Sequence, residues 1–169
     1  TEISVETSID AASGSFNLSL AARERTGAMD WPIEEGAACE VWLAGKTLIT
    51  GWIDVAERSS DSETTGLMVR GRDRTGDLVD CAAIHKPGSW RGRKLSQIAA
   101  ELLAPFGIGL AIMGDEGAPF TRFALQQGET VFAAIERMTR YRGLALWSPG
   151  DGTLAIGNPD TGLRTGRIV

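Results

Sequence analysis

The spacing of apolar residues changes once along this chain, and that change limits the possible folds more than any other feature. Before residue 85 apolar residues recur at every second position, as in strands with one buried face. After residue 89 they recur at intervals of three and four, as on amphipathic helices. The stretch HKPGS at 85–89 separates the two patterns. We therefore predict two domains, at residues 1–84 and 85–158, with 159–169 as a truncated or following segment.

The first domain is predicted to contain only strands. Alternation indicates strands at 1–7, 15–20, 39–43, 47–56 and 67–70, with a further β element after the turn at 71–77. Gly51, in the middle of the fourth of these, indicates a bulge or a bend of the kind that small barrels need at their corners. About six short antiparallel strands without a helix are typical of a small barrel or a sandwich.

The second domain is predicted to be a small α+β unit with two helices. The first helix carries its apolar residues on one face, at Leu95, Ile98, Ala99, Leu102 and Leu103, and ends at Pro105 and Gly107. Thr130 can cap a second helix that Gly143 ends. Strands are predicted at 108–113 and 120–125, and a hairpin at 144–147 and 153–156. The fold class is therefore α+β, an antiparallel β domain followed by a two-helix α+β domain.

A dense charged turn follows the strand at 67–70. Its principal residues are Gly71, Arg72, Asp73, Gly76 and Asp77. Charges of both signs alternate here, which predicts local ion pairs and turn hydrogen bonds in place of a binding patch of one sign. The two glycines allow backbone conformations that other residues resist. We predict a structural turn between two β elements.

Composition excludes several classes of protein. The net charge of −5 argues against a generic nucleic-acid-binding domain, which would carry a basic face. No apolar run approaches the length of a membrane span, so we expect no membrane contact. Cys39 and Cys81 are too few for a disulfide framework or a zinc site. Both lie in apolar strand patterns, which predicts buried free thiols, with a single disulfide between them as the alternative.

No motif in the sequence carries catalysis. The tripeptide at 45–47 resembles the end of a phosphate-binding loop, but Glu40 stands where that loop requires glycine. His85 is the one histidine, lies in the predicted linker and has no nucleophile motif to serve. We expect a solvent-exposed His85, no catalytic residue, no cofactor and no metal.

Two groups of residues are candidates for an interface. Trp90, Arg91 and Arg93 form a basic and aromatic cluster at the start of a helix, where the helix dipole disfavours positive charge. This indicates an anionic partner, either acidic side chains of a neighbouring subunit or phosphate, unless the cluster is solvated or paired within the chain. Trp42 and Trp52 lie opposite the main apolar stripe of their strands. They either meet a partner or are covered by the second domain.

Several segments resemble the baseplate hub proteins of Mu-like contractile-tailed phages and prophages, the 43 kDa tail protein family. They are SFNLSL at 15–20, ITGWID at 49–54, VRGRDRTGDLVDC at 69–81, PFGI at 105–108 and GETVFAAIERMTRYRGLAL at 128–146. A related helix-and-hairpin element occurs in the spike proteins of type VI secretion systems. Lys94 departs from the family pattern, which has a small hydroxylic helix cap at this position.

The resemblance implies a structural, non-enzymatic role. In the family, three copies form a ring between the hexagonal tail tube and the trimeric central spike, and each subunit carries two tube-like barrels. Residues 1–84 would then be the first tube-like barrel and 86–158 an inserted α+β domain, in the N-terminal portion of a hub. The expected partners are two further copies in a homotrimer, the tail tube protein and the central spike protein. The expected location is the virion tail baseplate, after assembly in the cytoplasm of the bacterial host.

An acidic hub suits a channel that DNA crosses without specific binding, because like charges repel. Two other interpretations remain open. The chain could be the hub of a tailocin or of another contractile injection particle, which shares these parts. It could also be a cell-wall-binding or wall-degrading tail module, which would need an exposed carboxylate or histidine in a cleft.

Overall fold

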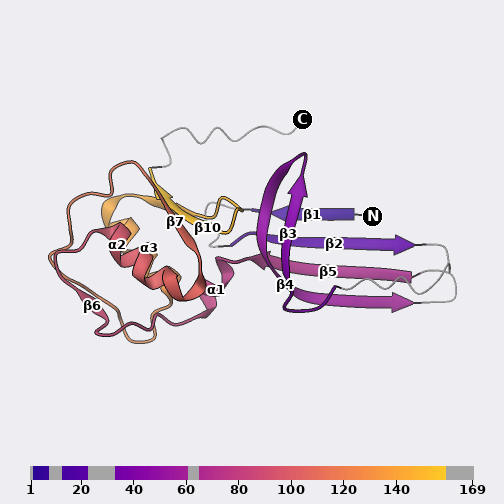
Figure 1. Ribbon diagram of the computed structural model, residues 1–169, viewed down its shortest axis with the longest axis horizontal. Helices are drawn as coiled ribbons and strands as arrows, with labels where there is room; N and C mark the ends of the chain where they lie inside the picture. Colours follow the sequence, from indigo (N-terminus) through magenta and orange to yellow (C-terminus); the bar gives the residue numbers. More distant parts are fainter. Residues whose placement is uncertain (1, 8–12, 23–32, 61–64, 159–169) are drawn as a thin grey trace.

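Five antiparallel strands form the first half of the structure (Figure 1). The computed structural model describes residues 2–7, 13–22, 33–60 and 65–158. The strands are β1 (Glu2–Glu6), β2 (Ser15–Ala22), β3 (Ala38–Leu43), β4 (Lys46–Ser60) and β5 (Thr65–Asp73), in the sheet order β1-β2-β5-β4-β3. The predicted segment 159–169 and most of the loop predicted around 21–32 lie outside the described residues.

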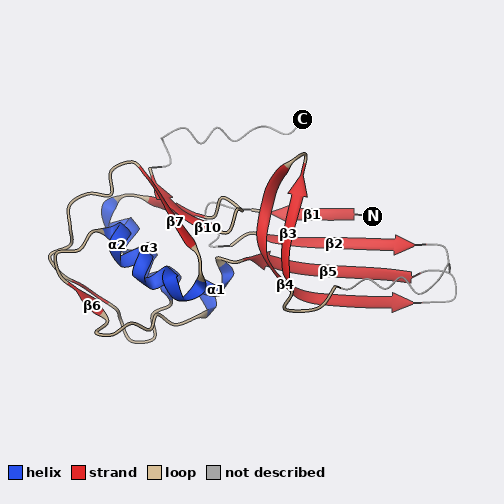
Figure 2. Ribbon diagram, in the orientation of Figure 1, coloured by secondary structure: helices blue, strands red, loops and turns tan. Residues whose placement is uncertain are grey.

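The sheet curls because β4 belongs to both of its parts. This strand bends along its length, so that β3 and the first part of β4 lie across the direction of β2 and β5 (Figure 2). The register against β5 shifts between Ile53 and Val55, just beyond Gly51, where we predicted a bulge or bend. Strands β1 and β3 are the two edges of the sheet. The predicted antiparallel β domain is therefore confirmed, as a curled half-barrel and not a closed barrel.

Two glycines allow β4 and β5 to approach closely at this bend. A Cβ atom on Gly51 would lie well inside contact distance of the Arg72 carbonyl oxygen. A Cβ atom on Gly71 would overlap the Trp52 carbonyl oxygen and the Phe16 ring. The apolar side chains beneath them form one cluster of buried residues, Phe16, Val41, Ile49, Ile53, Leu67 and Val69. Glycine at both positions thus permits the curl that encloses this core.

The second half is the predicted α+β unit. Its helices are α1 (Gly76–Asp80), α2 (Leu95–Leu103) with a following 3-10 turn η1 (Ala104–Phe106), and α3 (Val131–Arg142). Strand β10 (Thr153–Gly157) pairs in parallel with β7 (Gly109–Met113) and antiparallel with β9 (Ala145–Trp147), and β6 (Ser89–Trp90) pairs with β8 (Phe123–Ala124). Both long helices are therefore confirmed. The Thr130 hydroxyl accepts a hydrogen bond from the Ala133 backbone N–H at 3.2 Å, and Gly143 ends α3 with φ 67°.

The division between the halves lies earlier in the chain than we predicted. Leu78, on α1, is fully buried in the core of the α+β unit. The segment after it is tied to the start of α3, since the Val131 N–H donates to the Cys81 carbonyl oxygen and the Ala83 N–H to that of Glu129. The boundary thus falls between Asp73 and Thr75, not at 84/85. The element after the charged turn is a one-turn helix, too short for its apolar residues to show a helical period.

Two further expectations are wrong. His85 is not a solvated linker residue, because its ring stacks on Trp90 with centroids 4.7 Å apart and its Nε2 lies 3.4 Å from a Glu101 carboxylate oxygen. Cys81 is exposed and not buried, since it lies where α1 ends. Cys39 is half-buried, and burial raises the pKa of its thiol. Both cysteines are free.

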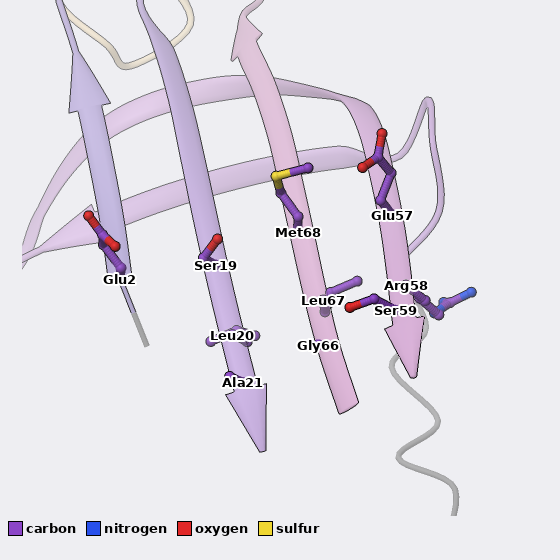
Figure 3. Close-up of a pocket in the computed structure, with 10 residues that line it drawn as sticks. All are labelled: Glu2, Ser19, Leu20, Ala21, Glu57, Arg58, Ser59, Gly66, Leu67 and Met68. Atoms are coloured by element: carbon purple, nitrogen blue, oxygen red, sulfur yellow. The ribbon is translucent and has the colours of Figure 1, made fainter. Parts of the chain in front are cut away.

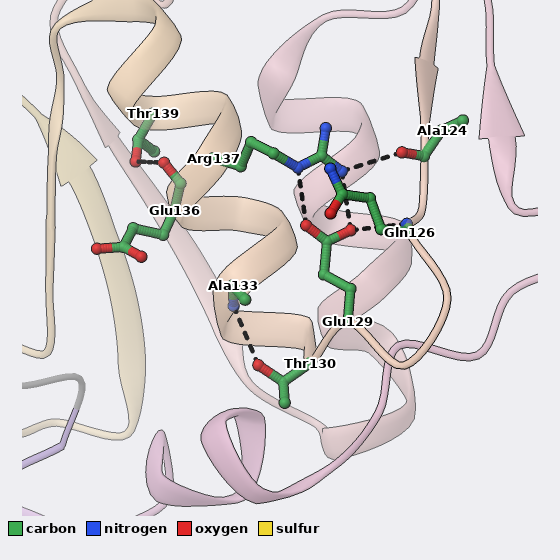
Figure 4. A network of polar contacts seen from close by, with 8 residues as sticks. All are labelled: Ala124, Gln126, Glu129, Thr130, Ala133, Glu136, Arg137 and Thr139. Carbon is green, nitrogen blue, oxygen red and sulfur yellow. Dashed lines mark hydrogen bonds and ion pairs between the residues drawn. The ribbon is translucent and has the colours of Figure 1, made fainter.

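A partly buried ion pair fixes the loop before α3 (Figure 4). The Arg137 guanidinium donates to both Glu129 carboxylate oxygens, at 2.7 and 2.8 Å, and to the Ala124 carbonyl oxygen at 3.0 Å. The Gln126 N–H also donates to Glu129, at 2.9 Å. These donors, the guanidinium first, hold the pKa of Glu129 below its usual range against the opposing effect of burial.

We predict that Gly51→Ala destabilises the chain by about 3 kcal/mol or more, because the added methyl overlaps backbone that cannot rotate away. Urea unfolding would measure the loss. Gly36→Ala is the control, since Gly36 has φ 80° and open space around it, so only the backbone strain of about 1 kcal/mol applies. Equal losses in the two variants would contradict the close approach described at the bend.

We predict that Glu129→Gln lowers the free energy of unfolding at pH 7 by about 1–2 kcal/mol, because the ionised partner of Arg137 is lost. The folded-state pKa of Glu129 is depressed, so its contribution is present above the unfolded pKa of about 4.3 and disappears as the pH falls through the folded pKa. The variant and the wild type should therefore converge in acid, as measured by urea unfolding across a pH series. In the control Glu136→Gln, which removes a more exposed i,i+4 pair with Arg140, the change should stay below about 0.5 kcal/mol.

Candidate interaction surfaces

A single buried carboxylate joins the half-barrel to the α+β unit. Asp73, the last residue of β5, is 1% exposed. Its Oδ1 accepts from the Thr75 N–H at 3.0 Å and from the Thr75 hydroxyl at 3.2 Å, and its Oδ2 accepts from the Ser148 hydroxyl at 2.7 Å. Ser148 lies in the loop between β9 and β10. The carboxylate therefore fixes both the start of α1 and the far hairpin of the α+β unit.

Backbone contacts complete this joint. A Cβ atom on Gly150, which has φ 90°, would overlap the Leu48 carbonyl oxygen of β4. The hairpin loop therefore lies directly against the half-barrel backbone, a position that only glycine permits. The Trp52 indole N–H donates to Asp77 at 3.0 Å, and the Arg74 guanidinium lies 5.4 Å from the centroid of the Trp52 ring.

The sequence left open whether Trp52 meets a partner or is covered by the second domain. Its half-buried position and its contact with α1 agree with coverage by the second domain.

The turn is shorter than we predicted, because Gly71, Arg72 and Asp73 end β5 and Gly76 and Asp77 begin α1. Its charged residues form a network. Arg72 pairs with Asp80 through a short contact and with Asp54 at 3.4 Å, so it connects β4, β5 and α1. The predicted local ion pairs and turn hydrogen bonds are present. Because these contacts link both halves, the surfaces described next belong to one fixed frame.

The face of the half-barrel opposite its core is polar and shallow (Figure 3). A row of paired residues, Glu2, Ser19, Met68 and Glu57, crosses β1, β2, β5 and β4. It lines a trough of about 730 Å³, with the two carboxylates on either side of the serine and the methionine. Arg70, on the same strand as Met68, lies 3.7 Å from Glu57. We call these five residues the polar outer face.

Apolar residues are exposed at both edges of the half-barrel. Ile3 on β1 is 49% exposed, and Trp42 and Leu43 on β3 are 60% and 54% exposed. Between these edges lies a groove of about 470 Å³, lined by Ile3, Leu18, Ile33, Val41 and Trp42 among others. The Trp42 indole N–H donates to Glu40 at 2.8 Å, which orients the ring. We call this the edge groove.

The structure separates the members of the predicted cluster around Trp90. Trp90 is 6% exposed, its ring packs between His85 and Phe123, and its indole N–H donates to Glu101 at 2.6 Å. Trp90 is thus a core residue and the expectation that it forms an interface is corrected. Arg91 and Arg93 are exposed. Lys94, the departure from the family pattern, lies at the helix cap, where its backbone N–H donates to Gln97 at 3.1 Å.

Other residues, which sequence reasoning missed, lie beside the two exposed arginines. Backbone hydrogen bonds of 2.8 Å join the 92–93 turn to Phe120, and Arg122 follows on the same segment. Tyr141, at the end of α3, is 76% exposed and its ring lies 5.9 Å from that of Phe120. No local signal in the sequence indicated that the segments of residues 91, 120 and 141 meet. We call Arg91, Arg93, Phe120, Arg122 and Tyr141 the arginine–aromatic face.

Two absences concern the described residues only. No helix among them is long and apolar enough to cross a membrane. No group of three or more histidine, cysteine and acidic side chains among them could hold a metal ion.

Comparison with known proteins identifies the family. Residues 1–73 match the family model of the Mu phage baseplate assembly protein GpP-like N-terminal domain, and residues 75–158 match that of the baseplate hub protein gp44-like second domain. The two models meet at the division that the hydrophobic cores indicate. Baseplate hub protein gp44 of Escherichia phage Mu is 34% identical over 159 residues, which is 92% of this chain and 41% of that protein.

Solved structures of related tail proteins support the same family assignment. The 43 kDa tail protein of prophage MuSo2 from Shewanella oneidensis superimposes with a TM-score of 0.83 and 37% identity, over 92% of this chain and 49% of that one. A tail protein from Neisseria meningitidis MC58 gives a TM-score of 0.76 and 26% identity, over 91% of this chain and 44% of that one. The Escherichia coli c3393 protein, described as a component of the type VI secretion system, shares the fold at 13% identity and a TM-score of 0.61.

This chain spans less than half the length of each of these relatives. The relatives from Mu-like phages and prophages are structural components of tails and not enzymes. The two family models together account for nearly all of the chain. The chain belongs to the baseplate hub proteins of Mu-like phages and prophages, as a structural component of the virion tail.

Proposed function

We propose that this chain is part of a trimeric ring that joins the tail tube to the central spike, assembled in the cytoplasm of the bacterial host. The hub relatives support the general role, and the open half-barrel is the observation that carries the specific one. Its two edge strands, β1 and β3, each expose apolar side chains, and their outer edges pair with no further strand of the described residues. Such edges are hazards in a monomer unless another chain covers them.

A ring of tube-like units covers these edges. In it, each edge groove receives part of a neighbouring half-barrel, either from another copy or from a further region of a longer hub chain. Trp42 is the strongest anchor, because a large exposed aromatic ring loses the most solvent contact when it is buried at an interface. Trp52 contributes through the joint, by holding the half-barrel and the α+β unit at a fixed angle.

In this ring the polar outer face lines the channel, and DNA passes along it without specific binding. The face carries the carboxylates of Glu2 and Glu57 and the hydroxyl of Ser19. The carboxylates repel phosphate, and the hydroxyl has no charge to attract it. The arginine on it, Arg70, is paired with Glu57, and the next arginine of β5 is paired with Asp54 and Asp80. Positive charge on this side of the sheet is therefore largely compensated. A tailocin or other injection particle would use the same contacts.

We predict that Trp42→Glu weakens assembly of the ring by at least tenfold, because a desolvated aromatic anchor at an interface is worth about 2 kcal/mol or more. Light scattering across a concentration series would compare this chain and the full-length hub, each with and without the substitution. Ile84→Glu is the matched control, since Ile84 is 86% exposed on the α+β unit, away from both edges. If Trp42→Glu still formed trimers at the wild-type concentration, the edge groove would not be part of the interface. If the full-length hub stayed monomeric in the presence of its spike partner, the proposed ring would be contradicted.

We predict that the wild-type ring does not retain double-stranded DNA, and that Glu57→Lys makes it do so in a salt-dependent way. The substitution adds a lysine and also releases Arg70, so the channel face becomes basic. Filter binding at low and high salt would measure retention. Glu34→Lys changes the net charge equally at an exposed position before β3 and should leave retention unchanged. Equal retention by both variants would show that Glu57 does not face the channel.

A further inference from the structure

Three exposed arginines gather on the arginine–aromatic face. β6 pairs with β8 through Trp90 and Phe123, and a separate bridge joins Arg93 to Phe120. Between these two pairs the backbone is irregular, because Gly92 has φ 61° and its N–H donates to the Phe120 carbonyl oxygen. Arg91 and Arg122 lie in the two short segments between the paired residues, and Arg91, Arg93 and Arg122 are all exposed. Like charges on neighbouring segments repel one another.

No carboxylate within the described part of the chain relieves this repulsion. Arg91, Arg93 and Arg122 make no ion pair with any described residue, whereas two other arginines of the same unit are paired, Arg137 with Glu129 and Arg140 with Glu136. Carboxylates of the α+β unit therefore neutralise Arg137 and Arg140, whereas the charges of Arg91, Arg93 and Arg122 have no described carboxylate beside them. For a chain whose net charge is −5, this local excess of positive charge is unfavourable in isolation.

Aromatic rings border the same charges. Phe120, Tyr141 and the guanidinium of Arg142 stack together, with Arg142 lying 4.5 Å from the Phe120 centroid and 5.4 Å from that of Tyr141. They line a pocket of about 460 Å³ that also includes Arg122. A pocket of this size takes one or two side chains. Its chemistry combines an apolar floor with a cationic rim, which is typical of protein interfaces.

We infer that the arginine–aromatic face binds an acidic polypeptide segment of another baseplate protein, with an apolar side chain in the pocket and carboxylates on the arginines. Arginine suits this partner, because its planar group binds a carboxylate with two hydrogen bonds and also stacks on rings. The face lies on the part of the α+β unit around β6, which Figure 1 shows at the end of the molecule remote from the half-barrel. It is therefore separate from the edge groove and the polar outer face, and the inference does not depend on the proposed ring.

Nucleic acid is the less suitable ligand on charge and shape. A phosphate backbone needs an extended basic track, whereas these three exposed arginines, one of which lines the pocket, form a compact site. The exposed Tyr141 ring also favours a partner that buries apolar surface against it. Both ligands are compared directly in the experiment below.

Fluorescence anisotropy would measure binding of a labelled peptide of alternating glutamate and phenylalanine, alongside a lysine–phenylalanine peptide and a short DNA duplex. The glutamate peptide should bind this chain, and the full-length hub, more tightly than either competitor and should weaken with salt. Arg122→Glu should reduce its affinity about tenfold or more. Lys46→Glu, an equal charge change on the half-barrel hairpin, should leave the affinity unchanged.

Stability separates a binding role from a structural one. Arg122→Glu introduces a carboxylate among exposed arginines that have no described partner, so the unfolding midpoint should stay the same or rise while peptide binding is lost. Four outcomes would overturn the inference: no binding of the glutamate peptide, equal losses in the two variants, tighter binding of the duplex, or a lowered midpoint in Arg122→Glu. Light scattering of the same variant reports on the ring, so failure of this inference and failure of the proposed ring are distinguishable.

Discussion

The buried carboxylate of Asp73 is the interaction on which the arrangement of this molecule depends. It ends β5, caps the turn into α1 through Thr75, and reaches the β9–β10 loop through Ser148. A buried carboxylate is costly unless hydrogen bonds satisfy it, and here three donors do so. Two of those donors belong to Thr75, two residues away in sequence, and the third belongs to the remote Ser148. The same group therefore connects local turn geometry to the relative position of the two halves.

The half-barrel shows how a structural function can arise without reactive groups. Its curl depends on glycine where β4 and β5 touch, and β1 and β3 are the edge strands of the sheet that the described residues form. One face of the sheet is the core and the other is polar, as alternation along each strand requires. Exposed apolar edges and a face that carries carboxylates are the two features on which the proposed ring and channel depend.

The α+β unit distributes its charges differently. Arg137 is held by Glu129 in a partly buried clamp that fixes the loop before α3, and this pair is structural. Arg91 and Arg122 are exposed on neighbouring segments, and neither pairs with a carboxylate of the described residues. Within this small unit, an arginine that pairs with a carboxylate stabilises the fold, whereas an exposed arginine without such a pair is available to a partner.

The sequence by itself determined the local structure and the family. Alternation predicted the strands, and the helical period with Thr130 and Gly143 predicted α3, because these signals depend only on neighbouring residues and backbone geometry. Tertiary structure alone decided the rest. Leu78 belongs to the second core, Trp90 is buried under His85, and Trp52 is covered by α1 while Trp42 is not. The bridge between Arg93 and Phe120 brings the segment of Arg122 beside that of Arg91. Each of these facts depends on which distant segments meet, and periodicity carries no information about contacts between segments far apart in the chain.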